Sequence, residues 1–253
     1  MENDQNVRGQ ASRPGLPPEG RTGAAPVSRE PDPAALPLRA DPMSHGPVLS
    51  ARSTAAAAAQ TTGAGRRTAL VMLITGIVGW LASFQLTVDD WRLLRDPTYR
   101  PPCNISPVVS CGSVMSSSQG SLFGFPNMLL GLGAFAAVAA LGVAVLTGAR
   151  LHRGLWLALD AGALTGVVFV HWLIVQSLYE LNKICPYCAC VWISTIALFW
   201  YVTLHCLEQG ILPAPRRVLM VLRDTHLLLL GAWYGVIALL VLTRFWPYWS
   251  SLL

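Results

Sequence analysis

The segment KICPYCACVW, residues 183–192, carries the pair of side chains best suited to chemistry. Cys185 and Cys188 are three positions apart, a spacing typical of thioredoxin-like redox motifs. Pro186 suits the first position of a helix, so we expect Cys185 to be the N-cap. Free amide groups and the helix dipole favour a thiolate there, and Lys183 adds a positive charge nearby. The motif therefore predicts a nucleophilic Cys185 that closes a reversible disulfide with Cys188.

A second cysteine pair, Cys103 and Cys111, lies in the long segment 89–125. Connections longer than about 12–15 residues are uncommon and often functional. Ser106 as N-cap and Pro107 as first helical residue predict a short helix, with Cys111 about one turn inside it. For this pair alone, a disulfide that staples the loop is the simpler interpretation. A second pair on the same face favours a shuttle, in which one cysteine meets a partner and the other meets the inner pair.

No further reactive or metal-binding group is expected from the other two cysteines or from the four paired ones. Cys190 and Cys206 fall inside an apolar run, where packing is the expected role. Four cysteines can bind zinc, but the spacing of the loop pair is wide and an oxidising face disfavours free thiolates. Ala-Cys rather than His follows the CxxC motif, so covalent haem attachment is not supported. We predict no metal site.

The composition is that of a membrane protein. Hydrophobic residues make up 53% of the 253 positions and charged residues 12%, against about 25% charged in typical soluble domains. A membrane-spanning helix needs roughly 20 mostly apolar residues. Five segments qualify: 68–88, 126–147, 155–179, 185–207 and 226–245. No basic stripe interleaved with aromatic residues accompanies the net charge of +5, so nucleic-acid binding is not expected.

Residues 1–65 contain no Phe, Trp, Tyr or Cys and are rich in Ala, Pro, Gly, Arg and Ser, which predicts a disordered tail without a signal peptide. Basic residues in short loops predict orientation, because they gather on the cytoplasmic side. One side of a chain that crosses five times would carry Arg66, Arg67, Arg150, Arg153, Arg216, Arg217 and Arg223. The N-terminus is therefore predicted to be cytoplasmic, and the four cysteines of the two pairs to face the outside, where disulfides persist.

Aromatic residues are expected to gather near the inner cysteine pair. They are Phe123, Phe125, Trp172, Tyr187 and Trp192, and His171 lies at the same depth. Such surroundings suit the ring of a lipid-soluble quinone, although Trp and Tyr also gather at membrane interfaces for other reasons. His171 has two interpretations: a hydrogen bond to a neighbouring helix, or proton delivery to a reduced quinone. Asp160 is expected to reach the cytoplasmic interface.

The two cysteine segments together resemble the vitamin K epoxide reductase family, in its bacterial, actinobacterial-type branch. PPCNISPVVSCGSVMSSSQGSLFGFPN is similar to the first external loop of the family, and CPYC to its catalytic dithiol. The resemblance covers roughly residues 66–207 and implies a four-helix membrane bundle around a quinone, capped by the loop helix. The segment 226–245 would be an additional fifth helix of an all-α membrane domain that spans residues 66–253.

The resemblance also implies roles for single residues. Cys103 would exchange with the partner, Cys111 would pass electrons inward to Cys185, and Cys188 would reduce the quinone. Ser117 matches a hydroxyl position near the quinone in the family. Trp192 stands where animal members have Tyr, which disfavours epoxide chemistry.

These inferences predict a quinone-dependent disulfide oxidoreductase. It would reoxidise a separate, extracytoplasmic thioredoxin-fold oxidase of the DsbA type and so support disulfide formation, since only a few residues follow the last helix. The use of 17 Arg to one Lys and the Ala-rich tail suggest a high-GC actinobacterium, and hence menaquinone as acceptor. The alternatives are a quinone epoxide reductase that uses the same relay, and a non-enzymatic membrane protein with structural disulfides.

Overall fold

The computed structural model describes residues 61–250, so most of the tail predicted for residues 1–65 lies outside the described residues. The first two described residues form a short strand, β1 (Thr61–Thr62), which pairs antiparallel with β2 (Leu151–His152). Trp156 is fully buried, and its indole N–H donates to the carbonyl of Thr62 at 3.2 Å. This hydrogen bond and the strand pairing give residues 61 and 62 an ordered place that the sequence analysis did not anticipate.

Almost all regular structure between residues 61 and 250 is helical. Besides the two strands, the elements are α2 (Arg66–Arg95), α3 (Cys111–Met115), η1 (Ser118–Ser121), α4 (Met128–Leu146), α5 (Arg153–Val175), η2 (Gln176–Glu180), α6 (Pro186–Glu208), α7 (Arg216–Arg244) and α8 (Trp246–Ser250). Within this range, five helices are long and apolar enough to cross a membrane: α2, α4, α5 with its π-helical end η2, α6 and α7. The all-α membrane class predicted from the sequence is confirmed.

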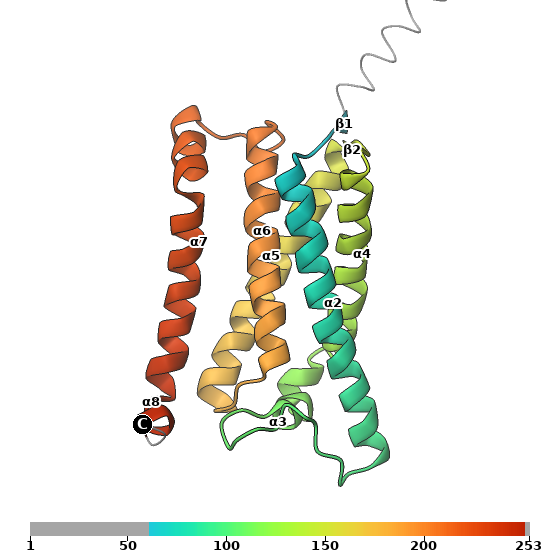
Figure 1. Cartoon of the computed structure of the whole chain (residues 1–253), viewed down its shortest axis with the longest axis vertical. Coiled ribbons are helices and arrows are strands. Elements are labelled where there is room, and N and C mark those ends of the chain that lie inside the picture. The colour runs from blue at the N-terminus through green and yellow to red at the C-terminus, as the bar shows by residue number, and fades with distance from the viewer. Residues whose placement is uncertain (1–60, 251–253) are drawn as a thin grey trace, which may run out of the picture. The chain divides into compact units, whose positions relative to one another are not determined.

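Four of the long helices form a bundle and the fifth flanks it. α2 packs along α4 and α6, and α6 packs in turn against α5 and α7 (Figure 1). The long loop that follows α2, with α3 inside it, covers one end of this bundle (Figure 1). α7 is tied to that end because Arg244 donates hydrogen bonds to the carbonyl of Leu178 and the side chain of Asn182, which precede α6.

Two of the expected helix ranges are too short. α2 continues past 88 to Arg95, because Leu86, Asp89 and Leu93 face the rest of the protein rather than open solvent. α7 begins at Arg216, directly after a proline that suits a helix start, and not at 226. Its first turns carry Arg216, Arg217 and Arg223, which lie outside the mostly apolar run from which the helix was predicted.

The helix predicted in the long loop begins later than expected. Ser106 does not cap a helix; its hydroxyl accepts hydrogen bonds from the N–H groups of Val108 and Val109 and so holds a tight turn. The helix α3 starts at Cys111, and Ser110 is its N-cap, with a side chain that accepts from the N–H of Ser113. Both serines are capping residues by type, and the sequence alone does not decide between them.

Close contact between α2 and α4 depends on glycines. A Cβ atom added to Gly142 of α4 would lie 2.7 Å from the backbone nitrogen of Leu73 in α2. Small residues at such positions let helix backbones approach each other within a membrane. Gly133, on the same helix, has no atom within 4 Å of the corresponding position. Gly142 is therefore needed for helix packing, whereas any effect of replacing Gly133 would come from backbone conformation alone.

We predict that Gly142→Ala destabilises the protein by roughly 1–3 kcal/mol, because the added methyl group forces α2 and α4 apart. Gly133→Ala is the matched control and should be neutral or stabilising by up to about 1 kcal/mol, since alanine is the better helix former. Thermal unfolding of both variants in detergent measures the difference. Equal unfolding temperatures for the two variants would contradict this account of the interface.

Candidate active site

A short backbone pairing brings the long loop to the start of α6. Val109 and Ile184 form a parallel bridge, in which the N–H of Ile184 donates to the carbonyl of Val108 at 2.8 Å. The N–H of Ser110 donates to the carbonyl of Ile184 at 3.0 Å. Each paired segment is followed at once by a cysteine, Cys111 after Ser110 and Cys185 after Ile184. The bridge therefore fixes both cysteines at the same place.

The loop cysteines form a disulfide that lies inside the protein. Cys103 and Cys111 are bonded, with Cα atoms 5.7 Å apart. Cys103 is 5% exposed and Cys111 is fully buried, packed with Leu86 and Met115. The side-chain oxygen of Asn104 accepts from the Ser110 hydroxyl and, at 3.0 Å, from the N–H of Gly112, so the segments on either side of the disulfide are also linked by hydrogen bonds.

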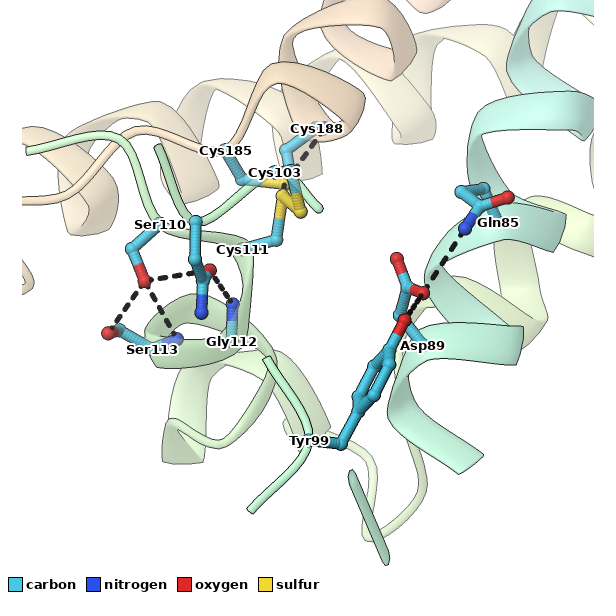
Figure 2. Close-up of a disulfide and its surroundings, with 11 residues drawn as sticks. Gln85, Asp89, Tyr99, Cys103, Ser110, Cys111, Gly112, Ser113, Cys185 and Cys188 are labelled. Carbon is cyan, nitrogen blue, oxygen red and sulfur yellow. Dashed lines mark hydrogen bonds between the residues drawn. A yellow bond between two sulfur atoms is a disulfide. The ribbon is translucent and has the colours of Figure 1, made fainter. Parts of the chain in front are cut away.

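The inner pair lies at the helix start predicted for it. Cys185 is the N-cap of α6, and its Sγ accepts a hydrogen bond from the N–H of Cys188 at 3.4 Å. Both are free thiols in this structure. The Cys185 Sγ lies 3.2 Å from the Cys111 Sγ, so the inner thiol contacts the outer disulfide directly (Figure 2). Thiol–disulfide exchange proceeds by attack of one sulfur on another, and this contact brings the reacting atoms together.

Hydrogen bonds tune the Cys185 thiol. Its pKa is lowered from the ordinary value mainly by the hydrogen bond with the Cys188 side chain, and further by the backbone N–H groups of Cys188 and Tyr187. Burial and the negative charge of Asp89 act in the opposite direction and raise this pKa. Lys183, expected to help, instead donates to the carbonyl of Pro107, so its role is to hold the loop against α6.

Asp89 is a buried carboxylate on the α2 face that meets the cysteines. It is fully buried, and its Oδ1 accepts from the Tyr99 hydroxyl at 2.9 Å and from the Gln85 amide at 3.1 Å (Figure 2). Its Oδ2 has no hydrogen-bond partner among residues 61–250. A buried charge is costly unless it is hydrogen-bonded, so the bonds from Tyr99 and Gln85 stabilise the carboxylate. The bond from Tyr99 has a second effect, because it attaches the loop before Cys103 to α2.

A large apolar cavity lies beside the inner pair. It has a volume of about 810 Å³ and extends between α2, α4, α5 and α6. Cys188 is in its wall, together with Met115, Trp192 and Phe123. Its few polar groups include Gln119 and Gln176, whose side-chain amides are hydrogen-bonded to each other at 3.4 Å. An apolar space with few polar groups is typical of sites for small organic molecules.

The fold, the two cysteine pairs and the cavity agree with a comparison to known families. The model of the vitamin K epoxide reductase family matches residues 70–203, more than half of the chain. The chain belongs to this family. No curated protein matches it significantly. Members of the vitamin K epoxide reductase family are membrane thiol–disulfide oxidoreductases that use quinones and generally work with a thioredoxin-like partner, so the chain is a multi-pass membrane oxidoreductase.

The family match ends within α6, so α7 lies outside it. α7 nevertheless contacts the bundle through specific bonds. The Trp233 indole N–H donates to the Nε2 of His171 at 3.0 Å, and the Tyr234 hydroxyl donates to the carbonyl of Ile193. These contacts, with those of Arg244, make the fifth helix part of the same structural unit as the bundle of this vitamin K epoxide reductase family member.

The structure divides the residues expected at the quinone into some that line the cavity and some that do not. Phe123 and Trp192 line the cavity. Ser117 does not; its hydroxyl donates to the carbonyl of Val114 and accepts from the N–H of Gly120, so it shapes the turn into η1. His171 is also outside the cavity lining, because its ring faces Trp233 of α7. Of its two interpretations, the hydrogen bond to a neighbouring helix is the one that the structure has.

Several residues of the site escaped the sequence analysis. Asp89, Tyr99 and Asn104 lie in or beside the loop, but no motif marks them. Gln119 and Gln176 are 57 positions apart, and only the folding of the loop onto η2 brings them together. The available signal was an unusual polar residue in or next to an apolar run, as for Asp89 and Gln176.

We predict that Asp89→Asn lowers the pKa of Cys185 further, because it removes the negative charge that opposes the thiolate while keeping an acceptor for Tyr99. In the fully reduced protein, the midpoint of Cys185 alkylation against pH should move to lower pH. Mass spectrometry of iodoacetamide-treated protein measures it. The midpoint is the readout because limited access to a buried thiol slows alkylation equally at every pH.

Asp90→Asn is the matched control, since the neighbouring carboxyl does not act on the Cys185 pKa. It should leave the alkylation midpoint where it is in the unmodified protein. A midpoint that stays unchanged in Asp89→Asn, or that moves equally in both variants, would show that Asp89 has no specific electrostatic influence on the dithiol.

Proposed function

We propose that this protein is a quinone-dependent disulfide generator, which reoxidises an extracytoplasmic thioredoxin-fold oxidase of the DsbA type. The single observation that carries the proposal is the 3.2 Å contact between the Cys185 and Cys111 sulfurs. Cys111 and Cys185 are 74 positions apart in the sequence, and their contact joins the pair on the loop to the pair at the wall of the apolar cavity. A structural disulfide has no need of a free dithiol against it.

The proposed relay moves two electrons from the partner to the outer pair, from the outer to the inner pair, and from the inner pair to a quinone. A dithiol of the partner attacks the Cys103–Cys111 disulfide at Cys103, and the partner leaves as a disulfide with both outer thiols reduced. The Cys111 thiolate then attacks Cys185 of the oxidised inner pair and expels Cys188. Cys103 attacks the resulting Cys111–Cys185 bond, which restores the outer disulfide and leaves the inner dithiol. A quinone takes up two electrons and two protons as the inner pair closes again.

The cavity supports a quinone as acceptor. Its wall includes Cys188, the sulfur that the relay releases, and is otherwise mostly apolar, as a ring with an isoprenoid tail requires. The amides of Gln119 and Gln176 are among the donors available to quinone oxygens. Menaquinone is the acceptor we propose, on the strength of the Arg-rich, Lys-poor composition. The N-terminus is proposed to be cytoplasmic and the cysteine end external.

Access to the outer disulfide requires motion of the loop. Cys103 is 5% exposed, so an approaching partner does not meet its sulfur directly. Ile105, two positions further, is 75% exposed and offers an apolar contact beside it. We propose that the partner docks there and that local opening of the loop uncovers Cys103. Loop segments without regular structure, such as the one around Cys103, open at low free-energy cost.

We predict that Cys188→Ala abolishes quinone reduction, because the sulfur at the cavity wall is missing. The Cys185 thiolate should instead attack Cys111 of the outer disulfide, so that a Cys111–Cys185 bond accumulates and Cys103 is released as a thiol. Non-reducing peptide mapping identifies the bond, and absorbance of the quinone follows the reaction. Cys190→Ala, two positions along α6 and outside the cavity lining, is the control and should keep full activity. Full activity of Cys188→Ala would disprove the relay.

We predict that Trp192→Phe raises the KM for quinone about fivefold, since the smaller ring loses about 1 kcal/mol of apolar contact. Trp200→Phe is the matched control on the same helix, where the side chain does not line the cavity, and its KM should not change. Steady-state assays with a soluble quinone and a reduced thioredoxin-fold partner give both values. Equal KM values in the two variants would place the quinone elsewhere.

The same purified protein separates the alternatives. With a dithiol and vitamin K epoxide, a quinone epoxide reductase would form the quinone, whereas the proposed enzyme would not. With quinone alone, the reduced Cys185–Cys188 pair should become a disulfide, followed by Cys103 and Cys111. Four thiols that remain reduced in the presence of quinone would support structural disulfides and end the proposal.

A further inference from the structure

A second hollow lies at the end of the bundle opposite to the cysteines. It has a volume of about 320 Å³ and is enclosed by the start of α2, the end of α6 and the first turns of α7. Unlike the apolar cavity, it is lined largely by polar and charged side chains. None of its residues takes part in the cysteine relay, and the α7 side of its wall lies outside the family match.

Positive charge dominates this polar pocket. Arg67 of α2 and Arg223 of α7 line it from two sides, and Glu208 of α6 is the one carboxylate among the described residues in its wall. His226 accepts from the Arg67 guanidinium at 3.3 Å, while its other ring nitrogen lies 2.6 Å from the carbonyl of Arg223. His226 therefore links the two arginine-bearing helices and holds Arg67 at the pocket.

The pocket also contains a buried nitrogen without a partner. His205 of α6 is 2% exposed, and its Nε2 has no hydrogen-bond partner within residues 61–250. Trp156 lies against the ring, with centroids 4.3 Å apart, so the imidazole is held in place. Buried polar atoms in folded proteins are nearly always hydrogen-bonded, and an exception needs an explanation. An anionic oxygen in the pocket would provide one once the side chains that close Nε2 off from solvent move aside, since an imidazole N–H donates to such oxygens.

We propose that this pocket binds a phosphate group, supplied by the headgroup of an anionic phospholipid. Arginines recognise phosphate oxygens through paired N–H donors, and His205 would add a further donor once its Nε2 is uncovered. The pocket lies where the helices end, at the depth of lipid headgroups. Exposed apolar side chains of α7, among them Met220, Leu227 and Leu228, offer a surface along which acyl chains can lie. Basic pockets between membrane helices bind anionic headgroups in this way.

Native mass spectrometry of the full-length protein in detergent, with phosphatidylglycerol or phosphatidylcholine added, tests the proposal. We expect phosphatidylglycerol to be retained at least tenfold more tightly than phosphatidylcholine. The double variant Arg67→Gln/Arg223→Gln should lose that preference. Arg66→Gln/Arg217→Gln is the matched control: it removes the same charge from the same two helices at positions outside the pocket, and the preference should remain.

A third variant has an expected gain of affinity, a result that misfolding cannot produce, and so keeps the test valid if the double variant does not fold. Glu208→Gln removes the carboxylate that opposes an anion and should tighten binding of phosphatidylglycerol. Retention that is the same for both lipids, or that falls equally in the pocket variant and its control, would overturn the proposal. So would Glu208→Gln with unchanged or weaker binding.

Inorganic phosphate distinguishes the two sources of the anion. If millimolar phosphate raises the Tm of the protein but not that of Arg67→Gln/Arg223→Gln, and phosphatidylglycerol shows no preference, the pocket serves a soluble phosphate and the lipid assignment is wrong. If phosphatidylglycerol alone stabilises the protein, the lipid is the ligand. The result is independent of the proposed function, because quinone-driven oxidation of the cysteines is measured separately and at the other end of the bundle.

Discussion

The pairing of Val109 with Ile184 is the constraint on which the rest of the site depends. A loop without its own core has no intrinsic reason to lie in one place, and closing it costs conformational entropy. The hydrogen bonds around this bridge, with that from Lys183, fix the loop to the chain segment that enters α6. Because a cysteine follows on each side, two sulfurs that are far apart in the sequence come into contact without any further specification.

The helix start of α6 then gives this contact a direction. Backbone N–H groups and the Cys188 side chain stabilise the thiolate of Cys185, whereas the Asp89 carboxylate limits that effect. Cys188 lies one turn further in, at the wall of the apolar cavity. One turn of helix thus joins a polar, hydrogen-bonded environment for exchange to an apolar one for a lipid-soluble acceptor. The two environments differ because Cys185 caps the helix and Cys188 is inside it.

Local signals in the sequence were sufficient for much of this arrangement. The apolar runs predicted five membrane helices, and Pro186 after Cys185 predicted the cap of α6. Choices between equivalent residues were not predictable: Ser106 and Ser110 are both capping residues, and only the pairing with Ile184 selects Ser110. The direction of His171 was equally open, because a helix position does not reveal which neighbour it faces. Asp89 and the Gln119–Gln176 pair depend on tertiary contacts that no motif encodes.

Burial of the sulfur atoms has a consequence for selectivity. Cys103, Cys111 and Cys185 are all enclosed, so a small thiol dissolved in the surrounding water cannot touch them while the loop is closed. In the proposed relay, such a thiol would otherwise reduce the outer disulfide, and its electrons would pass to the quinone without oxidation of any protein. In the proposed relay, a partner that opens the loop by binding to it reaches the outer disulfide, whereas a freely diffusing reductant does not. Under the proposed relay, burial of the sulfur atoms would therefore let the enzyme select protein thiols over small thiols by contact with the loop, before any disulfide exchange begins.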